Sequence, residues 1–212
     1  MKRFTDARAW ARASVRDVLK EWQGLGYNRR ALYLKRAAET ITRDYNGTFP
    51  KNFEALCKLP GVGKATAGDI MAFAWNIPVP VIETNIRSVY IHFFFKDKTS
   101  VSDTEIMPLI EKTIDTKNPR EWTWALFDYG AMLKKNNNPS RQSKHHVRQS
   151  KFEGSLRQKR GHVLRVLLEH SMSKEKLSKL VSYPPTTFQK IILSLEKDGL
   201  IRYNKNTLEI AM

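Results

Sequence analysis

The chain has 212 residues, of which 41% are hydrophobic, enough for one good core or for one domain with a small second one. No apolar run is long enough to cross a bilayer, and the first ten residues lack the apolar stretch of a signal peptide, so we expect a cytoplasmic location. The 37 Lys and Arg residues outnumber the 21 Asp and Glu residues, giving a net charge of +16. This charge favours a polyanionic partner such as nucleic acid over a membrane surface or a protein that is merely basic and soluble.

Cysteine usage narrows the chemistry further. The single cysteine, Cys57, cannot form an intrachain disulfide or a cysteine-ligated cluster. In the stretch FEALCKL it lies on an apolar helical face, and we expect a buried thiol.

The first two thirds of the chain are predicted to be a series of helices separated by turns that contain Gly or Pro. Thr84 or Asn85 is expected to cap the fifth helix, and Ser102 with Glu105 forms a capping box for the sixth. The predicted helices cover residues 5–20, 28–45, 53–59, 64–76, 86–95, 102–114 and 120–133.

The composition then changes. Residues 134–161 are polar and very basic, as in a linker or an extended arm. Beyond them, three predicted helices (162–171, 173–182 and 184–199) precede a hairpin-like stretch at 200–211. This is the element order of a winged helix-turn-helix, whose third helix would enter a major groove; the alternative is a small packing or dimerisation domain.

The stretch LPGVG, residues 59–63, connects two predicted helices and indicates a helix-hairpin-helix. Gly61 and Gly63 carry no side chains, so backbone N–H groups can approach a phosphate. The start of the second helix adds its positive dipole end, and Lys64 adds a charge. Such an element holds a DNA backbone without reading sequence, although alone the stretch could be any tight helix connection.

Three blocks now identify a family. WQGLGYNRRALYLKRAA, LPGVGKATAGDI with PVIETNIRSV, and ALFDYGAMLKK resemble, in order and spacing, the helix-hairpin-helix base-excision glycosylases of the endonuclease III and MutY superfamily, the MutY branch in particular. The resemblance covers roughly residues 2–135. It implies a mainly α glycosylase domain at 1–135, truncated at its N-terminus relative to the family. The composition and helix pattern beyond it predict a basic linker at 136–160 and a small winged-helix-like α+β domain at 161–212.

The resemblance also assigns roles to residues. Family members flip a base out of double-stranded DNA and cleave its glycosidic bond. Glu83 matches the family's catalytic carboxylate, usually Asp, which stabilises the sugar cation; alternatively it is a helix-capping or surface acid. Bifunctional members have a Schiff-base lysine where this chain has Ala65, and Lys64 is one residue early, about 100° away on a helix, so it is interpreted as a phosphate contact. Tyr27 matches a tyrosine that wedges into the duplex; alternatively it anchors its loop. The expected DNA-contacting residues are Gln23, Tyr27, Leu59, Gly61, Val62, Gly63, Lys64, Thr66 and Asn85.

Three departures from the family pattern stand out. The N-terminal helix whose glutamate protonates adenine in the MutY branch has no counterpart, so we expect a start codon placed too far downstream or a fragment; a true loss would expose apolar faces of the remaining helices. The family's four cluster cysteines are replaced by a basic stretch around His145 and His146, so neither an iron–sulfur cluster nor zinc is expected. The winged helix stands in place of the MutY domain that checks for 8-oxoguanine.

The function expected is that of a monomeric, monofunctional DNA glycosylase of base-excision repair, which removes a mismatched or damaged base, adenine opposite G or 8-oxoguanine foremost. The alternative is a non-enzymatic DNA-binding protein on a degenerate glycosylase fold with a winged helix. A third and weaker interpretation is a bifunctional lyase that uses Lys64.

Overall fold

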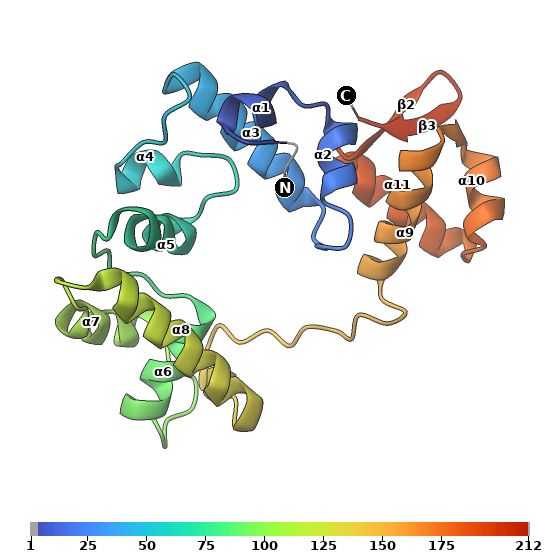
Figure 1. Ribbon diagram of the computed structural model, residues 1–212. Coiled ribbons are helices and arrows are strands. Elements are labelled where there is room, and N and C mark those ends of the chain that lie inside the picture. The colour runs from blue at the N-terminus through green and yellow to red at the C-terminus, as the bar shows by residue number, and fades with distance from the viewer. Residues whose placement is uncertain (1–3, 212) are drawn as a thin grey trace. The chain divides into compact units, whose positions relative to one another are not determined.

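The computed structural model describes residues 4–211 (Figure 1), and contacts divide the chain into two compact units. The first unit comprises Met1–Phe49, Leu59–Gly61 and Gln149–Met212, and the second comprises Pro50–Lys58 and Val62–Arg148. These units interleave along the chain and differ from the stretches predicted from the sequence. The predicted domain boundaries stay a prediction, because contacts alone do not show which parts fold independently.

The first unit contains three N-terminal helices and all the strands. The expected single helix over residues 5–20 is wrong: Ala13 is extended, and Ser14 starts a second helix by accepting a hydrogen bond from the Asp17 N–H at 3.1 Å. The elements are α1 (Ala7–Arg12), α2 (Val15–Glu21), α3 (Arg29–Asp44), α9 (Leu156–Glu169), β1 (Met172–Ser173), α10 (Lys174–Val181), α11 (Pro185–Lys197), β2 (Ile201–Asn204) and β3 (Thr207–Ile210).

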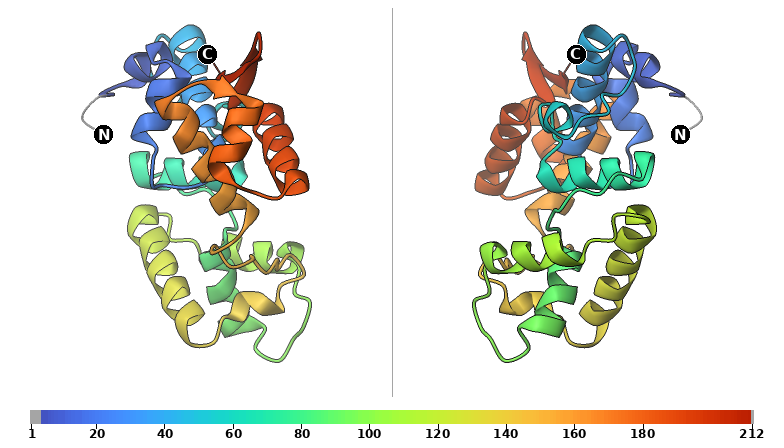
Figure 2. Two further views of the ribbon diagram at one scale, coloured as in Figure 1. Left: turned by 90° about the vertical axis from the view of Figure 1, so that its right-hand side faces the viewer. Right: turned by 90° about the vertical axis from the view of Figure 1, so that its left-hand side faces the viewer.

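One hydrophobic core joins the two ends of the first unit. Val18 and Trp22 of the α2 region are buried in the same cluster as Leu32 of α3 and as Leu167 and Ile191 of the C-terminal helices. In Figure 2 the blue N-terminal helices lie beside the orange and red C-terminal elements. Each such side chain contributes about 1.5–3 kcal/mol on burial. The apolar face of α2 and the start of α3 therefore pack here against the C-terminal elements.

The C-terminal elements follow the predicted order of three helices and a ribbon. The sheet has strand order β1-β3-β2, all antiparallel, and β2 pairs with β3 from Ile201 opposite Ile210 to Asn204 opposite Thr207. Leu208 and Ile210 alternate along β3 with half-buried neighbours, so one face of the sheet packs on the core. As predicted, Pro starts α11 and Gly199 follows its end with φ of +71°.

The second unit is helical and has its own core, which includes Ile91, Ile106, Ile110, Leu126 and Leu133. The capping box of Ser102 and Glu105 at the start of α7 is confirmed. The elements are α4 (Phe53–Cys57), α5 (Lys64–Trp75), α6 (Thr84–Phe94), α7 (Asp103–Thr113), α8 (Pro119–Asn136) and the 3₁₀ helix η1 (Pro139–Gln142).

Three local predictions are corrected in the second unit. The N-cap of α6 is Glu83 and neither Thr84 nor Asn85, since the Glu83 carboxylate accepts the first free N–H groups of the helix. Cys57 is only partly buried. The stretch expected to be a linker begins in the last turn of α8, continues into an ordered turn, η1, whose Pro139 and Ser140 are buried, and ends inside α9.

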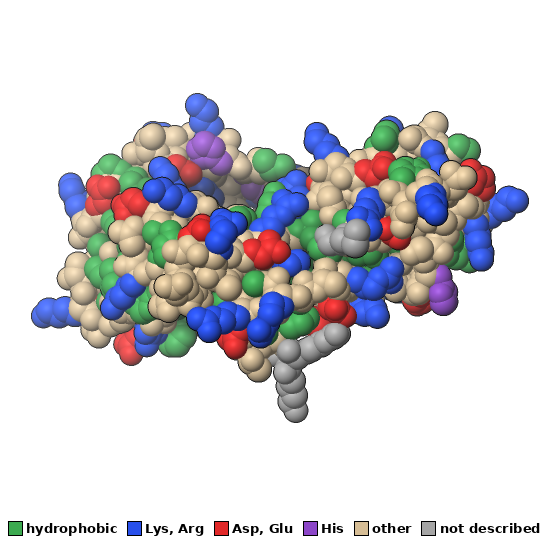
Figure 3. All heavy atoms as spheres, turned by 90° about the horizontal axis from the view of Figure 1, so that it is seen from above, with side chains coloured by type: hydrophobic (Ala, Val, Ile, Leu, Met, Phe, Trp, Pro, Cys, Tyr) green, Lys and Arg blue, Asp and Glu red, His purple; other side chains and the backbone are tan. Residues whose placement is uncertain are grey.

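The mainly helical fold class is confirmed. No helix within residues 4–211 is both long enough and apolar enough to cross a membrane. Lys and Arg side chains are spread over the face seen in Figure 3, with fewer acidic side chains between them.

Candidate functional site

The two glycines of the LPGVG turn differ in their surroundings. Gly61 has φ of +78°, and a Cβ there would lie 2.5 Å from the Cβ of Tyr33, so packing itself requires glycine. Gly63 has φ of −89°, and a Cβ there would meet no atom within 4 Å. Of these two glycines, only Gly63 therefore leaves open space in front of the turn. Both glycines were predicted from the sequence to let a phosphate approach the backbone.

The start of α5 offers unpaired backbone donors. Gly63 caps this helix without any side-chain hydrogen bond, so the N–H groups of its first turn have no side-chain acceptor among residues 4–211. Lys64 and Thr66 are exposed beside them, whereas Leu59 is buried and Val62 is partly buried. Free N–H groups, a positive helix end and a lysine together suit a phosphate.

Glu83 is fixed at the N-terminus of α6. Its Oε1 accepts hydrogen bonds from the N–H of Asn85 at 2.5 Å and from the N–H of Ile86 at 2.9 Å. Its Oε2 has no hydrogen-bond partner among the described residues. One carboxylate oxygen thus holds the helix while the other stays available. Behind this point α8 approaches closely, because a Cβ on Gly130 would lie 2.4 Å from the Asn85 carbonyl oxygen.

Asp69 of α5 is a second carboxyl group near Glu83. Burial, and then the charge of Glu83, raise the pKa of Asp69 to about 6, and its buried Oδ1 has no partner among the described residues. Asp69 is not among the predicted site residues. The signal that could have found it is a lone carboxylate in the otherwise small and apolar run KATAGDIMAFAW.

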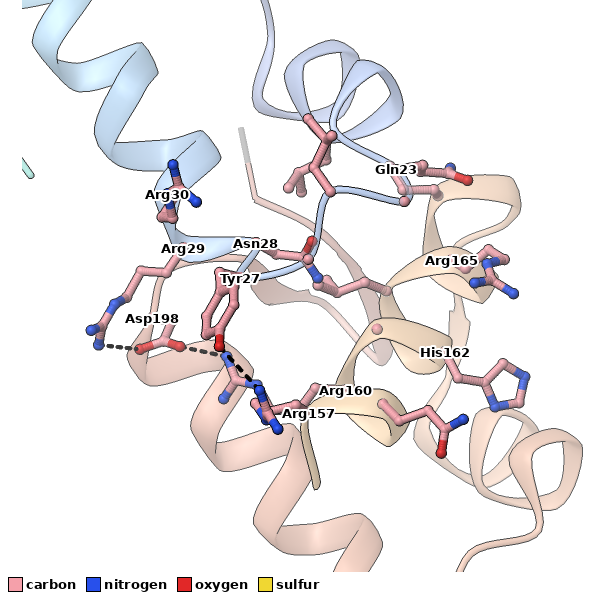
Figure 4. A pocket seen from close by; sticks show the side chains of 18 of the residues that line it. Gln23, Tyr27, Asn28, Arg29, Arg30, Arg157, Arg160, His162, Arg165 and Asp198 are labelled. Carbon is pink, nitrogen blue, oxygen red and sulfur yellow. Dashed lines mark hydrogen bonds and ion pairs between the residues drawn. The ribbon is translucent and has the colours of Figure 1, made fainter. Parts of the chain in front are cut away.

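Gln23 and Tyr27 lie in the first unit, on the loop between α2 and α3, and both line a cavity of about 860 Å³ (Figure 4). Tyr27 has φ of +48°, is 55% exposed, and its hydroxyl oxygen accepts a hydrogen bond from Arg157 at 3.1 Å. The predicted site residues thus belong to two different compact units. Gln23, Tyr27, Leu59 and Gly61 belong to the first, and Val62, Gly63, Lys64, Thr66, Glu83 and Asn85 belong to the second.

Comparison with known proteins gives a consistent result. Residues 44–73 match the family model described as "Helix-hairpin-helix motif". The chain is 32% identical over 143 residues to the adenine DNA glycosylase of Buchnera aphidicola subsp. Baizongia pistaciae, and 45% identical over 89 residues to that of Mycobacterium tuberculosis. These alignments cover 66% and 42% of this chain. The chain is homologous to the helix-hairpin-helix DNA glycosylases.

Solved structures of these glycosylases share the fold. A thermostable thymine-DNA glycosylase superposes with a TM-score of 0.57 at 22% identity, covering 66% of this chain and 65% of the other. An endonuclease III in a non-covalent DNA complex gives a TM-score of 0.50 at 20% identity, covering 64% and 61%. The chain spans only 40% and 29% of the length of the Buchnera and Mycobacterium glycosylases.

The iron–sulfur cluster that the glycosylase resemblance implies does not fit this chain. The stretch after α8 has no cysteine, and its polar side chains bind one another and the backbone. Asn138 Oδ1 accepts a hydrogen bond from the Ser140 hydroxyl at 2.6 Å, and Gln142 donates to the Lys96 carbonyl at 2.9 Å. Such a cluster needs thiolates. Within residues 4–211 no three His, Cys, Asp or Glu side chains are grouped to hold a metal ion. Function without a cofactor stays a prediction.

Proposed function

We propose that this chain is a monofunctional DNA glycosylase that hydrolyses the glycosidic bond of a mismatched or damaged base in double-stranded DNA. The observation that carries the proposal is the placement of Glu83. This residue matches the family carboxylate in the sequence motif, and it caps the N-terminus of α6 with Oε2 unbonded among the described residues. The names of the relatives favour adenine as the base. The opposite base, G or 8-oxoguanine, comes from the sequence resemblance to the MutY branch alone.

In this mechanism the base leaves as the C1′–N bond breaks, and a sugar cation develops. The negative charge of Glu83 faces that cation, which is where a fixed carboxylate lowers the barrier most. The oxygen of a water molecule bonds to C1′ as the water loses a proton. The departing base gains a proton, so the overall reaction is hydrolysis. The two backbone hydrogen bonds to Oε1 hold the longer glutamate side chain in place, so the extra methylene relative to Asp need not loosen the site.

The residues at the start of α5 support the proposal that the chain has no lyase activity. Ala65 stands where bifunctional members have the Schiff-base lysine, and Lys64 is displaced by one residue, about 100° around the helix. Lys64 is exposed at the helix N-terminus, where its charge suits a phosphate. Borohydride should therefore trap no covalent complex, and trapping that disappears in Lys64→Ala would establish a lyase.

The test is a base-release assay on duplexes with A opposite 8-oxoguanine, A opposite G, T opposite G and U opposite G. Strand breaks that appear only after hot alkali are expected, from one of the A-containing duplexes. Glu83→Gln should abolish base release and keep DNA binding. Glu111→Gln is the matched control, because Glu111 is exposed on α7. Full activity of Glu83→Gln would contradict the assignment.

A non-enzymatic DNA-binding protein is the second candidate, favoured by one observation. The elements of residues 156–210 have the order of a winged helix, which binds DNA without chemistry. This candidate predicts tight binding to every duplex in the assay and no abasic product from any of them.

A further inference from the structure

The cavity of about 860 Å³ lies wholly within the first unit, and its lining has an unusual composition. It is formed by the loop between α2 and α3, the start of α3, α9 and the residue after α11. A single carboxylate, Asp198, stands among five arginines: Arg29, Arg30, Arg157, Arg160 and Arg165. Such an excess of one charge in a hollow concentrates positive potential and attracts an anion.

Two of the five arginines share the single carboxylate, and the other three form no ion pair among the described residues. Asp198 pairs with Arg160 at 2.5 Å and with Arg29 at 3.5 Å, and Figure 4 shows it between them. Arg157 and Arg165 form no ion pair with any residue in the described part of the chain. Their charge is therefore free for a ligand, and guanidinium groups bind phosphate through two parallel N–H donors.

Arg157 is also held in position beside exposed rings. It donates to the Tyr27 hydroxyl at 3.1 Å and to the Ser150 carbonyl at 2.8 Å. Its guanidinium carbon lies 5.8 Å from the ring centre of Tyr27 and 6.0 Å from that of Phe152. Phe152 is 59% exposed and Tyr27 is 55% exposed. Exposed aromatic faces next to unpaired arginines are the composition of sites that bind single-stranded nucleic acid.

We propose that this pocket binds an unpaired nucleotide of a DNA strand, with one backbone phosphate on Arg157, a neighbouring one on Arg165 and the base stacked on Phe152. The proposal rests on the proposed function only in naming DNA as the polyanion. It gives the C-terminal elements a role other than groove binding through α11, because Arg157 and Arg165 belong to α9 and Phe152 precedes it. The loop with Tyr27 and the C-terminal helices would then form one binding site.

The experiment measures binding of a fluorescent oligothymidylate of about ten nucleotides to the full chain by anisotropy, over a range of salt concentrations. Phe152→Ala should weaken binding about tenfold, as expected for loss of one stacked base. Arg157→Ala and Arg165→Ala should each weaken binding. Each should also make the negative slope of log K against log salt shallower by about 0.7. Lys179→Ala on α10 is the control for general charge and should leave the slope within about 0.2 of the parent value.

Three outcomes would overturn the proposal. The first is unchanged binding in Phe152→Ala and Arg157→Ala. The second is a loss confined to Lys190→Ala, which would place the strand on α11. The third is binding of thymidine monophosphate as tight as that of the oligomer, which would indicate a free nucleotide as ligand. Base release is a separate readout: if no duplex loses a base while Phe152→Ala still weakens strand binding, the glycosylase proposal fails and the pocket stands.

Discussion

Gly130→Ala tests whether the contact between α8 and α6 positions the candidate catalytic carboxylate. A Cβ on Gly130 would lie 2.4 Å from the Asn85 carbonyl oxygen and 2.7 Å from its carbonyl carbon, whereas ordinary contacts begin near 3.4 Å. The obstacle is backbone, so it cannot rotate away as a side chain would. The two helices must separate by about 1 Å, the difference between 2.4 and 3.4 Å.

Both stability and catalysis should suffer. Forcing a methyl group into a packed contact costs about 1–3 kcal/mol, and we expect the free energy of unfolding to fall by about 2 kcal/mol. Asn85 is two residues from Glu83, and its N–H bonds the Glu83 carboxylate, so the shift passes directly to the site. A misplacement of about 1 Å is expected to slow base release on the order of 100-fold.

The measurements are urea denaturation and single-turnover base release at saturating protein, which separates the chemical step from DNA binding. Gly161→Ala is the stability control, because Gly161 lies in α9 and a Cβ there meets nothing within 4 Å. It should raise stability by about 1 kcal/mol, the usual gain of Ala over Gly in a helix. Parent-like stability and rate in Gly130→Ala would refute the reasoning.

Three further predictions concern single residues. Gly63→Ala should leave the melting temperature within about 2 °C of the parent, because a methyl group there meets no protein atom. The same methyl group obstructs a phosphate, so duplex binding, measured by anisotropy, should weaken about tenfold. Asp69→Asn should raise the free energy of unfolding at pH 7.5 by about 1 kcal/mol after allowance for solvent screening. A pKa of about 6 means that the folded protein holds the proton more tightly than the unfolded chain, so the parent loses stability as pH rises from about 4 through 6. Urea titrations at pH 4 and 7.5 should show the advantage of the variant at the higher pH only. Asp198→Asn should lower stability by about 1–3 kcal/mol in urea titrations, because Arg160 and Arg29 lose their shared partner, and an unchanged midpoint would show that the arginines find other acceptors.

Local signals predicted much of the fold. The Gly-x-Gly turn, the capping box at Ser102 and the Pro and Gly that bound α11 all act within about one helical turn, where sequence spacing sets the geometry directly. The same locality explains the errors. Ser14 can continue a helix or cap a new one, and Glu83 competes with Thr84 and Asn85 for the cap of α6, so the choice depends on tertiary packing that spacing does not encode.

The candidate site was predictable where it follows a linear motif and not where it depends on distant segments. Glu83 follows from the match to the family pattern, and its role stays a prediction. Asp69 shows no such match. Its raised pKa comes from burial and from the nearby charge of Glu83, which only the folded structure reveals. The two roles of Gly61 and Gly63 are equally hidden in sequence, because Tyr33, the neighbour that distinguishes them, is 28 positions before Gly61.

The C-terminal elements show the limit most clearly. Their amphipathic pattern predicted three helices and a ribbon, yet a pattern tells which face is apolar and not what covers it. The structure buries Leu167 and Ile191 in one cluster with Val18 and Trp22, which are more than a hundred residues away in the chain. The same contact brings Arg157 to Tyr27 and so forms the arginine-lined cavity. A binding pocket that depends on such long-range packing cannot be found by reading either segment alone.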